Sequence, residues 1–465
     1  MVMKFLILSF FLISFASAKE KLNVLFIAVD DLKPMIGAYG FKQVKTPNID
    51  TLAEQGTIFL KNYCQWPVCG GSRASLMSGL YPESTGVMDL KTKMRDSNPS
   101  IVSLPEYLKN NGYQTGGVGK IYDPRCVDSK KKADAPSWTV PFIGLSHGKI
   151  KAKDGNEFAG ILKADDSETT DGTIALEGIN LLKKFAADKK PFFLAVGFKK
   201  PHLPFYAPEK YWNLYSEKDI SLAENDKPSK NASIYGWHDS PEFRGYGGVP
   251  KNGPISDNIK RKAIHGYLAC TSFIDAQVGL LLNELKKLNL DKNTVVVFWG
   301  DHGFHLGDHG MWGKHTTLEQ AAAAPLIIKV PDSKARAVNA TSGLIDIYPT
   351  ICDSLGLGIP NFLQGKSQFG VISGKTEKVR EGIITCFKSK GATGYSFRTE
   401  RYRYIEWIKK GKIEAVELYD YENDPAESEN IASTSKGKKL CSELSSKMRN
   451  EGEGCKDLYL KQAQK

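Results

Sequence analysis

Four short apolar runs, each ending in polar or charged residues, constrain the fold of this chain most strongly. They lie at Leu22–Val29, Thr115–Val118, Phe192–Val196 and Thr294–Trp299. Apolar runs of this length without alternation are typical of strands that are buried on both faces, as in parallel sheets. The chain therefore contains the strands of a buried sheet.

Helical segments lie between these strands. One helix is expected to start at Thr46-Pro47 and to end at Gly56. A second is expected to start at the capping box of Ser103 and Glu106 and to end at Gly112. A long amphipathic segment at about 257–288 precedes the last strand. This alternation predicts an α/β fold with a large, mainly parallel sheet flanked by helices, and ligands bind such sheets beyond the carboxyl ends of the strands.

The pattern of apolar and polar residues changes after Gly374. Short alternating runs at Gly382–Phe387, Thr393–Phe397, Tyr402–Trp407 and Glu417–Tyr421 predict strands, and Ser435–Arg449 predicts a polar helix. We expect a catalytic domain over residues 19–375 and a smaller antiparallel α+β subdomain over 376–465. Lys130–Lys132 and Lys227–Asn252 are expected to be surface loops that could border a cleft.

Residues 1–18 are typical of a cleaved signal peptide. An apolar run at 5–15 follows Lys4 and ends at Ala16-Ser17-Ala18, a small-residue cleavage pattern. No later stretch approaches the length of a membrane span. We therefore expect cleavage near Ala18, a periplasmic or secreted protein and no membrane span.

The net charge and the cysteines leave alternatives open. A formal charge of +11 favours an anionic partner, or is a solvated basic surface, and no motif supports nucleic-acid binding. Of the eight cysteines, Cys441 and Cys455 are close enough in sequence to pair, and so are Cys64 and Cys69.

Two acidic pairs follow strands and indicate a metal site. Asp30-Asp31 follows the first strand and Asp301-His302 follows the last. Adjacent carboxylates repel each other unless a cation holds them, and a hard divalent metal prefers oxygen ligands. The alternative for each pair is a helix cap with a solvated neighbour.

Cys69 is the candidate nucleophile. It lies in the stretch Val68–Arg73, which opens the helical segment Ala74–Ser78. A cysteine at a helix N-terminus with Arg73 four residues later has an electropositive setting, which suits an anionic derivative and an anionic substrate. The alternatives are a buried core cysteine or one half of a disulfide.

The segment from Cys69 to Gly79 resembles the signature of the type I sulfatases, which runs Cys-x-Pro/Ala-Ser-Arg and continues to Thr-Gly-Arg. Further family motifs follow in the same order: Gly119-Lys120, Lys200-Pro201-His202-x-Pro204, Asp301-His302-Gly303, Trp312-Gly313-Lys314, Glu417-Leu418-Tyr419 and Asp424-Pro425. The Lys-Pro-His-x-Pro-Phe run and His302 are most similar to the iduronate-2-sulfatase branch. The resemblance covers nearly the whole mature chain and implies an alkaline phosphatase-like fold.

The resemblance also implies a mechanism. A maturation enzyme would oxidise Cys69 to formylglycine, one hydroxyl of whose hydrate attacks sulfur and releases the alcohol, after which loss of the second hydroxyl's proton expels sulfate. Asp30, Asp31, Asp301, His302 and the modified Cys69 would hold Ca²⁺, with Mg²⁺ as the alternative. Arg73 would steady the formylglycine, Lys120 and Lys314 would grip the sulfate, and His202 would protonate the leaving alcohol.

Three positions depart from the family pattern. Gly71 replaces Pro or Ala, Leu80 replaces the downstream Arg, and Asp123 replaces the His that takes up a proton as sulfate leaves. Asp123 itself, or a histidine of the loop after Asp301, would take that proton. In this loop we expect His305 and His315, ahead of His309, to contact substrate.

The sequence therefore predicts an exported sulfatase that acts on a sulfated sugar or polysaccharide. Two alternatives remain: a phosphate or phosphonate ester hydrolase of the same fold, and a catalytically silent protein that binds sulfated glycans through an unmodified Cys69.

Overall fold

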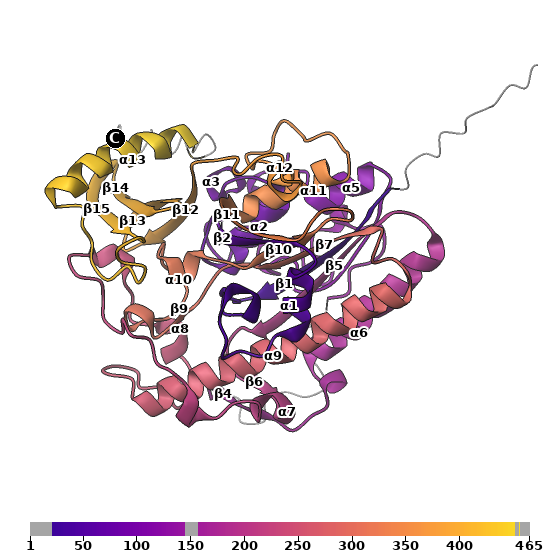
Figure 1. The fold of residues 1–465 in the computed structure, drawn as a ribbon, viewed down its shortest axis with the longest axis horizontal. Coiled ribbons are helices and arrows are strands. Elements are labelled where there is room, and N and C mark those ends of the chain that lie inside the picture. The colour runs from indigo at the N-terminus through magenta and orange to yellow at the C-terminus, as the bar shows by residue number, and fades with distance from the viewer. Residues whose placement is uncertain (1–20, 145–156, 452–454, 456–465) are drawn as a thin grey trace, which may run out of the picture.

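The computed structural model describes residues 21–144, 157–451 and 455. The predicted signal peptide and its cleavage site lie outside these residues. A central seven-stranded sheet has the order β11-β2-β10-β7-β1-β5-β3 (Figure 1). Its strands are β1 (Asn23–Asp30), β2 (Thr57–Tyr63), β3 (Gln114–Gly119), β5 (Phe192–Pro201), β7 (Thr294–Gly300), β10 (Leu326–Lys329) and β11 (Arg336–Gly343).

The middle of this sheet is parallel. β1 pairs in parallel with β5 and β7, and β3 pairs in parallel with β5. β11 pairs in parallel with β2, whereas β10 runs antiparallel to both β2 and β7. The four strands expected from the sequence are confirmed, and so is the mainly parallel sheet.

Both faces of the sheet are buried, which explains why its strands lack polar alternation. In β1, Leu25, Ile27 and Val29 enter one hydrophobic core. The intervening Val24, Phe26 and Ala28 enter a second core on the opposite face. Helices complete each core and shield both faces of the sheet from solvent.

The helices divide between the two cores. The first core receives α1 (Pro47–Ala53), α6 (Thr170–Asp188) and the long α9 (Asp257–Lys287). The second receives α2 (Cys69–Ser78), α5 (Leu104–Asn110) and α11 (Ile347–Ser354). Shorter helices are α3 (Pro82–Thr85), α4 (Met94–Ser97), α7 (Glu209–Trp212), α8 (Pro241–Arg244), α10 (Glu319–Ala322) and α12 (Phe369–Ile372).

Both expected helices begin where the sequence indicates, but their first turns are capped differently. Ser103 and Glu106 make the capping box of α5. Thr46 is the N-cap of α1, but its hydroxyl does not cap the helix. The carboxylate of Asp275 in α9 instead accepts the backbone N–H of Asn48 and of Ile49, at 3.0 and 2.8 Å.

A second sheet lies beside the first, at the yellow end of the chain in Figure 1. It is an antiparallel meander of β12 (Gly382–Ser389), β13 (Ala392–Thr399), β14 (Tyr402–Lys409) and β15 (Lys412–Asp420), which α13 (Ser435–Glu451) packs against. The expected antiparallel α+β unit is thereby confirmed. The division at 375/376 falls between α12 and β12 and stays a prediction. Two-stranded ribbons pair β4 (Ala159–Leu162) with β6 (Phe205–Pro208), and β8 (His305–Leu306) with β9 (Trp312–Gly313).

The structure contradicts both disulfide pairings that the sequence suggests. All eight are free thiols, so Cys64 is not bonded to Cys69, and Cys441 is not bonded to Cys455. Proximity in sequence is a weak guide here, because Cys441 lies within α13 while Cys455 is buried against other parts of the chain. Among the described residues, no helix combines the length and apolar character needed to cross a membrane.

Candidate active site

The carboxyl ends of the parallel strands gather the predicted polar side chains at one edge of the sheet. Asp30 is the last residue of β1, and Asp31 follows it with a positive φ of 57°. Asp301 and His302 follow β7, Lys120 follows β3, and His202 follows β5. Parallel pairing of these strands therefore places residues that are far apart in sequence side by side.

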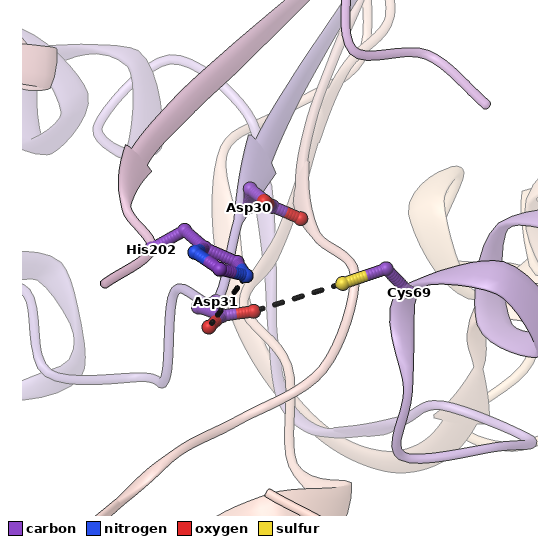
Figure 2. Close-up of side chains that lie close together, drawn as sticks. All are labelled: Asp30, Asp31, Cys69 and His202. Carbon is purple, nitrogen blue, oxygen red and sulfur yellow. Dashed lines mark hydrogen bonds and ion pairs between the residues drawn. The ribbon is translucent and has the colours of Figure 1, made fainter. Parts of the chain in front are cut away.

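Cys69 faces this edge from the first residue of α2. Its Sγ lies 3.8 Å from Asp31 Oδ1 and 3.3 Å from His302 Nε2. Figure 2 shows Asp30, Asp31, Cys69 and His202 pointing toward one another, and one ligand atom of each lies within 4.8 Å of the others. Cys69, Asp301 and His302 form a second group of this kind. Burial and the carboxylate of Asp30 raise the pKa of the Cys69 thiol well above its ordinary value.

Arg73, one turn along α2, ties the two acidic strand ends together. Its guanidinium donates to Asp301 Oδ2 at 2.8 Å and to Asp30 Oδ1 at 3.1 Å. It also donates to the carbonyl oxygens of Lys120 and Ile121. Arg73 is fully buried, so its charge is matched by fixed partners rather than by water.

Two lysines complete the charge balance. Lys120 Nζ lies 2.6 Å from Asp30 Oδ2, and Lys314 Nζ lies 2.7 Å from Asp31 Oδ2. Burial alone would raise the pKa of Asp30, but Lys120 and Arg73 outweigh it and hold that pKa well below its ordinary value. For Asp31, His202 and Lys314 likewise outweigh burial and lower the pKa to about 2. Both carboxylates are therefore ionised.

The donor set fits a divalent cation. His302 Nδ1 lies 2.9 Å from the carbonyl oxygen of Gly303, which can only accept, so Nδ1 carries the proton. The other ring nitrogen, Nε2, then lies 3.4 Å from Asp31 Oδ1 and 3.7 Å from Asp301 Oδ1. Acceptors that face acceptors in a buried site are stabilised by a cation between them.

His202 approaches the same edge from the opposite side, and a residue missed in the sequence lies beside it. His202 Nδ1 lies 2.7 Å from the Leu203 carbonyl, which leaves Nε2 facing the site. Glu242 Oε1 lies 3.6 Å from that Nε2, and Glu242 Oε2 lies 3.4 Å from Lys314 Nζ. Glu242 lies on α8 within a loop rich in Gly, Pro and Ser, where no local pattern marks a site residue.

Asp123, His315 and His305 occupy different surroundings. Asp123 lines the cavity, but Arg125 donates to both of its oxygens, at 2.9 and 2.7 Å, and holds its pKa below the ordinary value despite burial. His315 also lines the cavity, and burial and Lys314 lower its pKa to about 3, so its ring is neutral.

His305 is not brought to the cavity wall. It is fully buried, and its ring nitrogens face the Thr316 hydroxyl at 3.0 Å and the Asp308 carbonyl at 3.2 Å. His309 is also buried, 3.8 Å from Glu427 Oε2. His305 is therefore engaged within the loop that carries Lys314, whereas His309 faces residues outside that loop.

A cavity of about 970 Å³ opens onto Cys69. Basic side chains line it from several loops, and Glu242 and Asp171 are among the acidic ones. The basic lining residues are Lys120, Arg125, Lys130, Lys199, Lys200 and Lys314. The loops expected to border a cleft do so, through Lys130 and through Pro241 and Glu242.

The structure explains why Gly71 and Leu80 occupy two signature positions. A Cβ at Gly71 would lie 2.7 Å from atoms of the Trp66 ring and 2.8 Å from the Val87 carbonyl oxygen. Trp66 thus fills the space that a Pro or Ala side chain would need. Leu80 is buried in the second core, where an uncompensated arginine would be costly.

Comparisons with known proteins agree with this geometry. Residues 22–357 match the family model described as Sulfatase, and residues 307–453 match the model described as N-sulphoglucosamine sulphohydrolase, C-terminal. Iduronate 2-sulfatase of Mus musculus is 30% identical over an alignment of length 505, which covers 89% of this chain and 91% of that protein.

Two solved structures share the fold. One is a protein in complex with its substrate D-glucosamine-2-N,6-O-disulfate, with a TM-score of 0.75, 21% identity, and coverage of 94% of this chain and 99% of that chain. The other is the phosphonate monoester hydrolase of Agrobacterium radiobacter, with a TM-score of 0.78, 22% identity, and coverage of 93% and 95%. The family match spans most of the chain, and the chain therefore belongs to the sulfatase family of sulfuric ester hydrolases.

Proposed function

We propose that this protein hydrolyses sulfate esters of sulfated sugars or polysaccharides, with a nucleophile made by conversion of Cys69 to formylglycine. The single observation that carries the proposal is the position of Cys69 Sγ. One ligand atom each of Asp30, Asp31, Asp301 and His302 lies within 4.8 Å of this sulfur. Three buried or part-buried cations, those of Arg73, Lys120 and Lys314, pair with Asp30 and Asp31.

Asp30, Asp31, Asp301 and His302 would hold a divalent metal beside residue 69. Ca²⁺ is the preferred ion, because three of the four ligands are carboxylates, and Mg²⁺ is the alternative. A bound metal would serve as a Lewis acid toward the sulfate group. Arg73 keeps Asp30 and Asp301 in place from behind, which fixes the spacing of the ligands.

The three cations suit the negative charge that sulfur's oxygens and the leaving oxygen carry in the transition state. Lys120 pairs with Asp30, and Lys314 pairs with Asp31. Both lysines would bind the sulfate oxygens as point charges. Arg73 would steady residue 69 from the same helix. Because these cations are buried, they need little reorganisation when negative charge develops during the reaction.

His202 would donate the proton to the leaving alcohol from Nε2. That nitrogen faces the cavity, because Nδ1 is held by the Leu203 carbonyl. Glu242 Oε1 lies 3.6 Å from Nε2 and would hold the ring in place. The proton released as sulfate leaves would go to Asp123, whose two oxygens Arg125 holds, or to a histidine of the loop after Asp301 such as His315, and both residues line the cavity.

The substrate class follows from the cavity and from the relatives. A basic lining suits a polyanionic glycan, and the relatives include an iduronate 2-sulfatase. A structure with the same fold holds a disulfated glucosamine as its substrate. We propose that the protein is exported after cleavage near Ala18 and needs a formylglycine-generating enzyme as a maturation partner.

A phosphonate or phosphate ester hydrolase is the second candidate, because a hydrolase of that class shares the fold. The test compares kcat/KM for nitrophenyl sulfate and for an aryl phosphate diester, using protein made with a maturation enzyme, and Cys69→Ala as the control. Preference for the sulfate, lost in Cys69→Ala, is expected. Preference for the diester would favour the second candidate, and no turnover of either with retained binding of sulfated glycans would favour the silent binding protein.

A further inference from the structure

A second cluster of reactive side chains lies away from the active site. Cys386 in β12, Cys455 beyond α13 and Glu83 in α3 bring one ligand atom each within 4.8 Å of the others. Cys386 is 0% exposed and Cys455 is 2% exposed. Cys455 Sγ lies 3.7 Å from Glu83 Oε2.

The cluster joins three separate parts of the chain. Tyr81 and Tyr63 from the large unit pack in one hydrophobic core with Tyr395 of β13 and Leu444 of α13, and both thiols belong to that core. A covalent link between the two sulfurs would attach the residue that follows α13 to the edge strand β12. It would therefore fasten the C-terminal helix to its sheet.

We propose that Cys386 and Cys455 form a disulfide that ties the end of the chain after α13 to β12. The two sulfurs already lie within reach, and side-chain rotation alone can close such a gap when the backbone positions allow it. This link replaces the Cys441–Cys455 pairing considered from sequence spacing. It does not depend on the proposed function.

The oxidation balances with a small-molecule disulfide as the oxidant. One cysteine thiolate attacks this disulfide, forms a mixed disulfide and releases one thiolate. The other cysteine then attacks the bound protein sulfur and releases the second thiolate, so that two protein sulfurs are oxidised and one disulfide is reduced to two thiols.

Glu83 is suited to take the proton of the attacking thiol inside the core. Burial raises the pKa of this carboxyl group, and both thiols lie in hydrogen-bonding range of it. Burial also raises the pKa of Cys455 to about 11, so an adjacent proton acceptor matters for its reaction. Glu83 thereby has a role in forming the bond rather than in holding it.

A structural metal is the competing occupant, and the ligand set disfavours it. Structural zinc sites use four protein ligands from Cys, His and carboxylates. Among the residues that the structure describes, this cluster contains two thiols and one carboxylate only. A disulfide needs just the two sulfurs.

Peptide mapping of the full-length protein tests the proposal. The purified protein is incubated with oxidised glutathione, alkylated without reduction, digested and weighed. We expect a cross-linked pair of peptides that contain Cys386 and Cys455, lighter by two hydrogen masses than the separate peptides and lost on reduction. Cys441→Ser, at a half-buried thiol of α13, should leave the link intact. Alkylation of both Cys386 and Cys455 would overturn the proposal, as would a stoichiometric metal whose removal is needed to expose them.

Thermal unfolding distinguishes a disulfide between Cys386 and Cys455 from noncovalent packing of the two thiols. With a disulfide, Cys386→Ala, Cys455→Ala and the double variant should all lower the unfolding temperature by similar amounts. Reduction should bring the oxidised parent down toward the same value. If reduction leaves the unfolding temperature of the oxidised parent unchanged, the thiols contribute by packing alone and the proposal is wrong. Glu83→Gln should slow formation of the link with glutathione.

Discussion

Replacement of Gly71 by alanine tests why this chain departs from the sulfatase signature. The added Cβ would lie 2.7 Å from the Trp66 ring and 2.8 Å from the Val87 carbonyl oxygen, which is a backbone atom that cannot turn away. Overpacking of a well-filled core costs about 1–3 kcal/mol. Alanine within a helix regains about 1 kcal/mol over glycine. Because one contact is with a backbone atom, the overpacking cost should lie at the upper end of this range, so the net loss in unfolding free energy should be about 2 kcal/mol.

Urea unfolding followed by tryptophan fluorescence measures this loss as a lower midpoint for Gly71→Ala. Gly358→Ala is the matched control, because the nearest atom to its new Cβ is the Tyr107 hydroxyl at 4.0 Å. Gly358→Ala should leave the midpoint unchanged. Trp66→Leu in the same chain should relieve the contact, so the double variant should lose less stability than the two single losses added together. A Gly71→Ala variant as stable as the parent would refute the assignment of Trp66 as the reason for Gly71.

Three further predictions concern the site and its supporting frame. Glu242→Gln should lower kcat/KM for a sugar sulfate by about fivefold, because a part-exposed charge at 3.6 Å from His202 is worth about 1 kcal/mol. It should change little for nitrophenyl sulfate, whose leaving group needs no proton. A chelator should abolish hydrolysis and Ca²⁺ should restore it, whereas unchanged turnover in the metal-free protein would contradict the proposed ligand set. Burial raises the pKa of Asp275 from 3.8 to about 6, so the folded chain binds a proton that the unfolded chain lacks between these values. The parent should therefore lose up to about 2–3 kcal/mol of stability relative to Asp275→Asn as the pH rises through this window, as measured by urea unfolding at several pH values; equal pH dependence of the two proteins would disprove the shift.

The sheet and its active edge could be predicted because both depend on local patterns. A strand such as β1, buried on both faces, reads as an unbroken apolar run, and its end is marked by Asp30-Asp31. β2, β10 and the edge strand β11 were not predicted. β2 lies next to the sheet edge and exposes Leu60 and Lys61 partly, while β10 is only four residues long. Neither carries a distinctive signal of its own.

Other features depend on contacts between distant segments. Glu242 joins the site only because α8 folds against the loop that carries Lys314, and nothing around residue 242 in the sequence indicates this. His305 is predicted as a substrate contact because it lies in the glycine-rich loop after Asp301-His302, but its ring contacts the Thr316 hydroxyl instead. The proximity of Cys386 to Cys455 likewise arises from packing of the C-terminal unit.

The state of residue 69 in the purified protein tests the account most directly. Protein made together with a formylglycine-generating enzyme is digested, and the peptide that contains residue 69 is weighed and fragmented. We predict that residue 69 carries an aldehyde in place of its thiol, and that the aldehyde fraction across preparations is proportional to the rate of sulfate ester hydrolysis. Hydrolysis at the full rate by protein in which Cys69 is entirely an unmodified thiol would contradict the account.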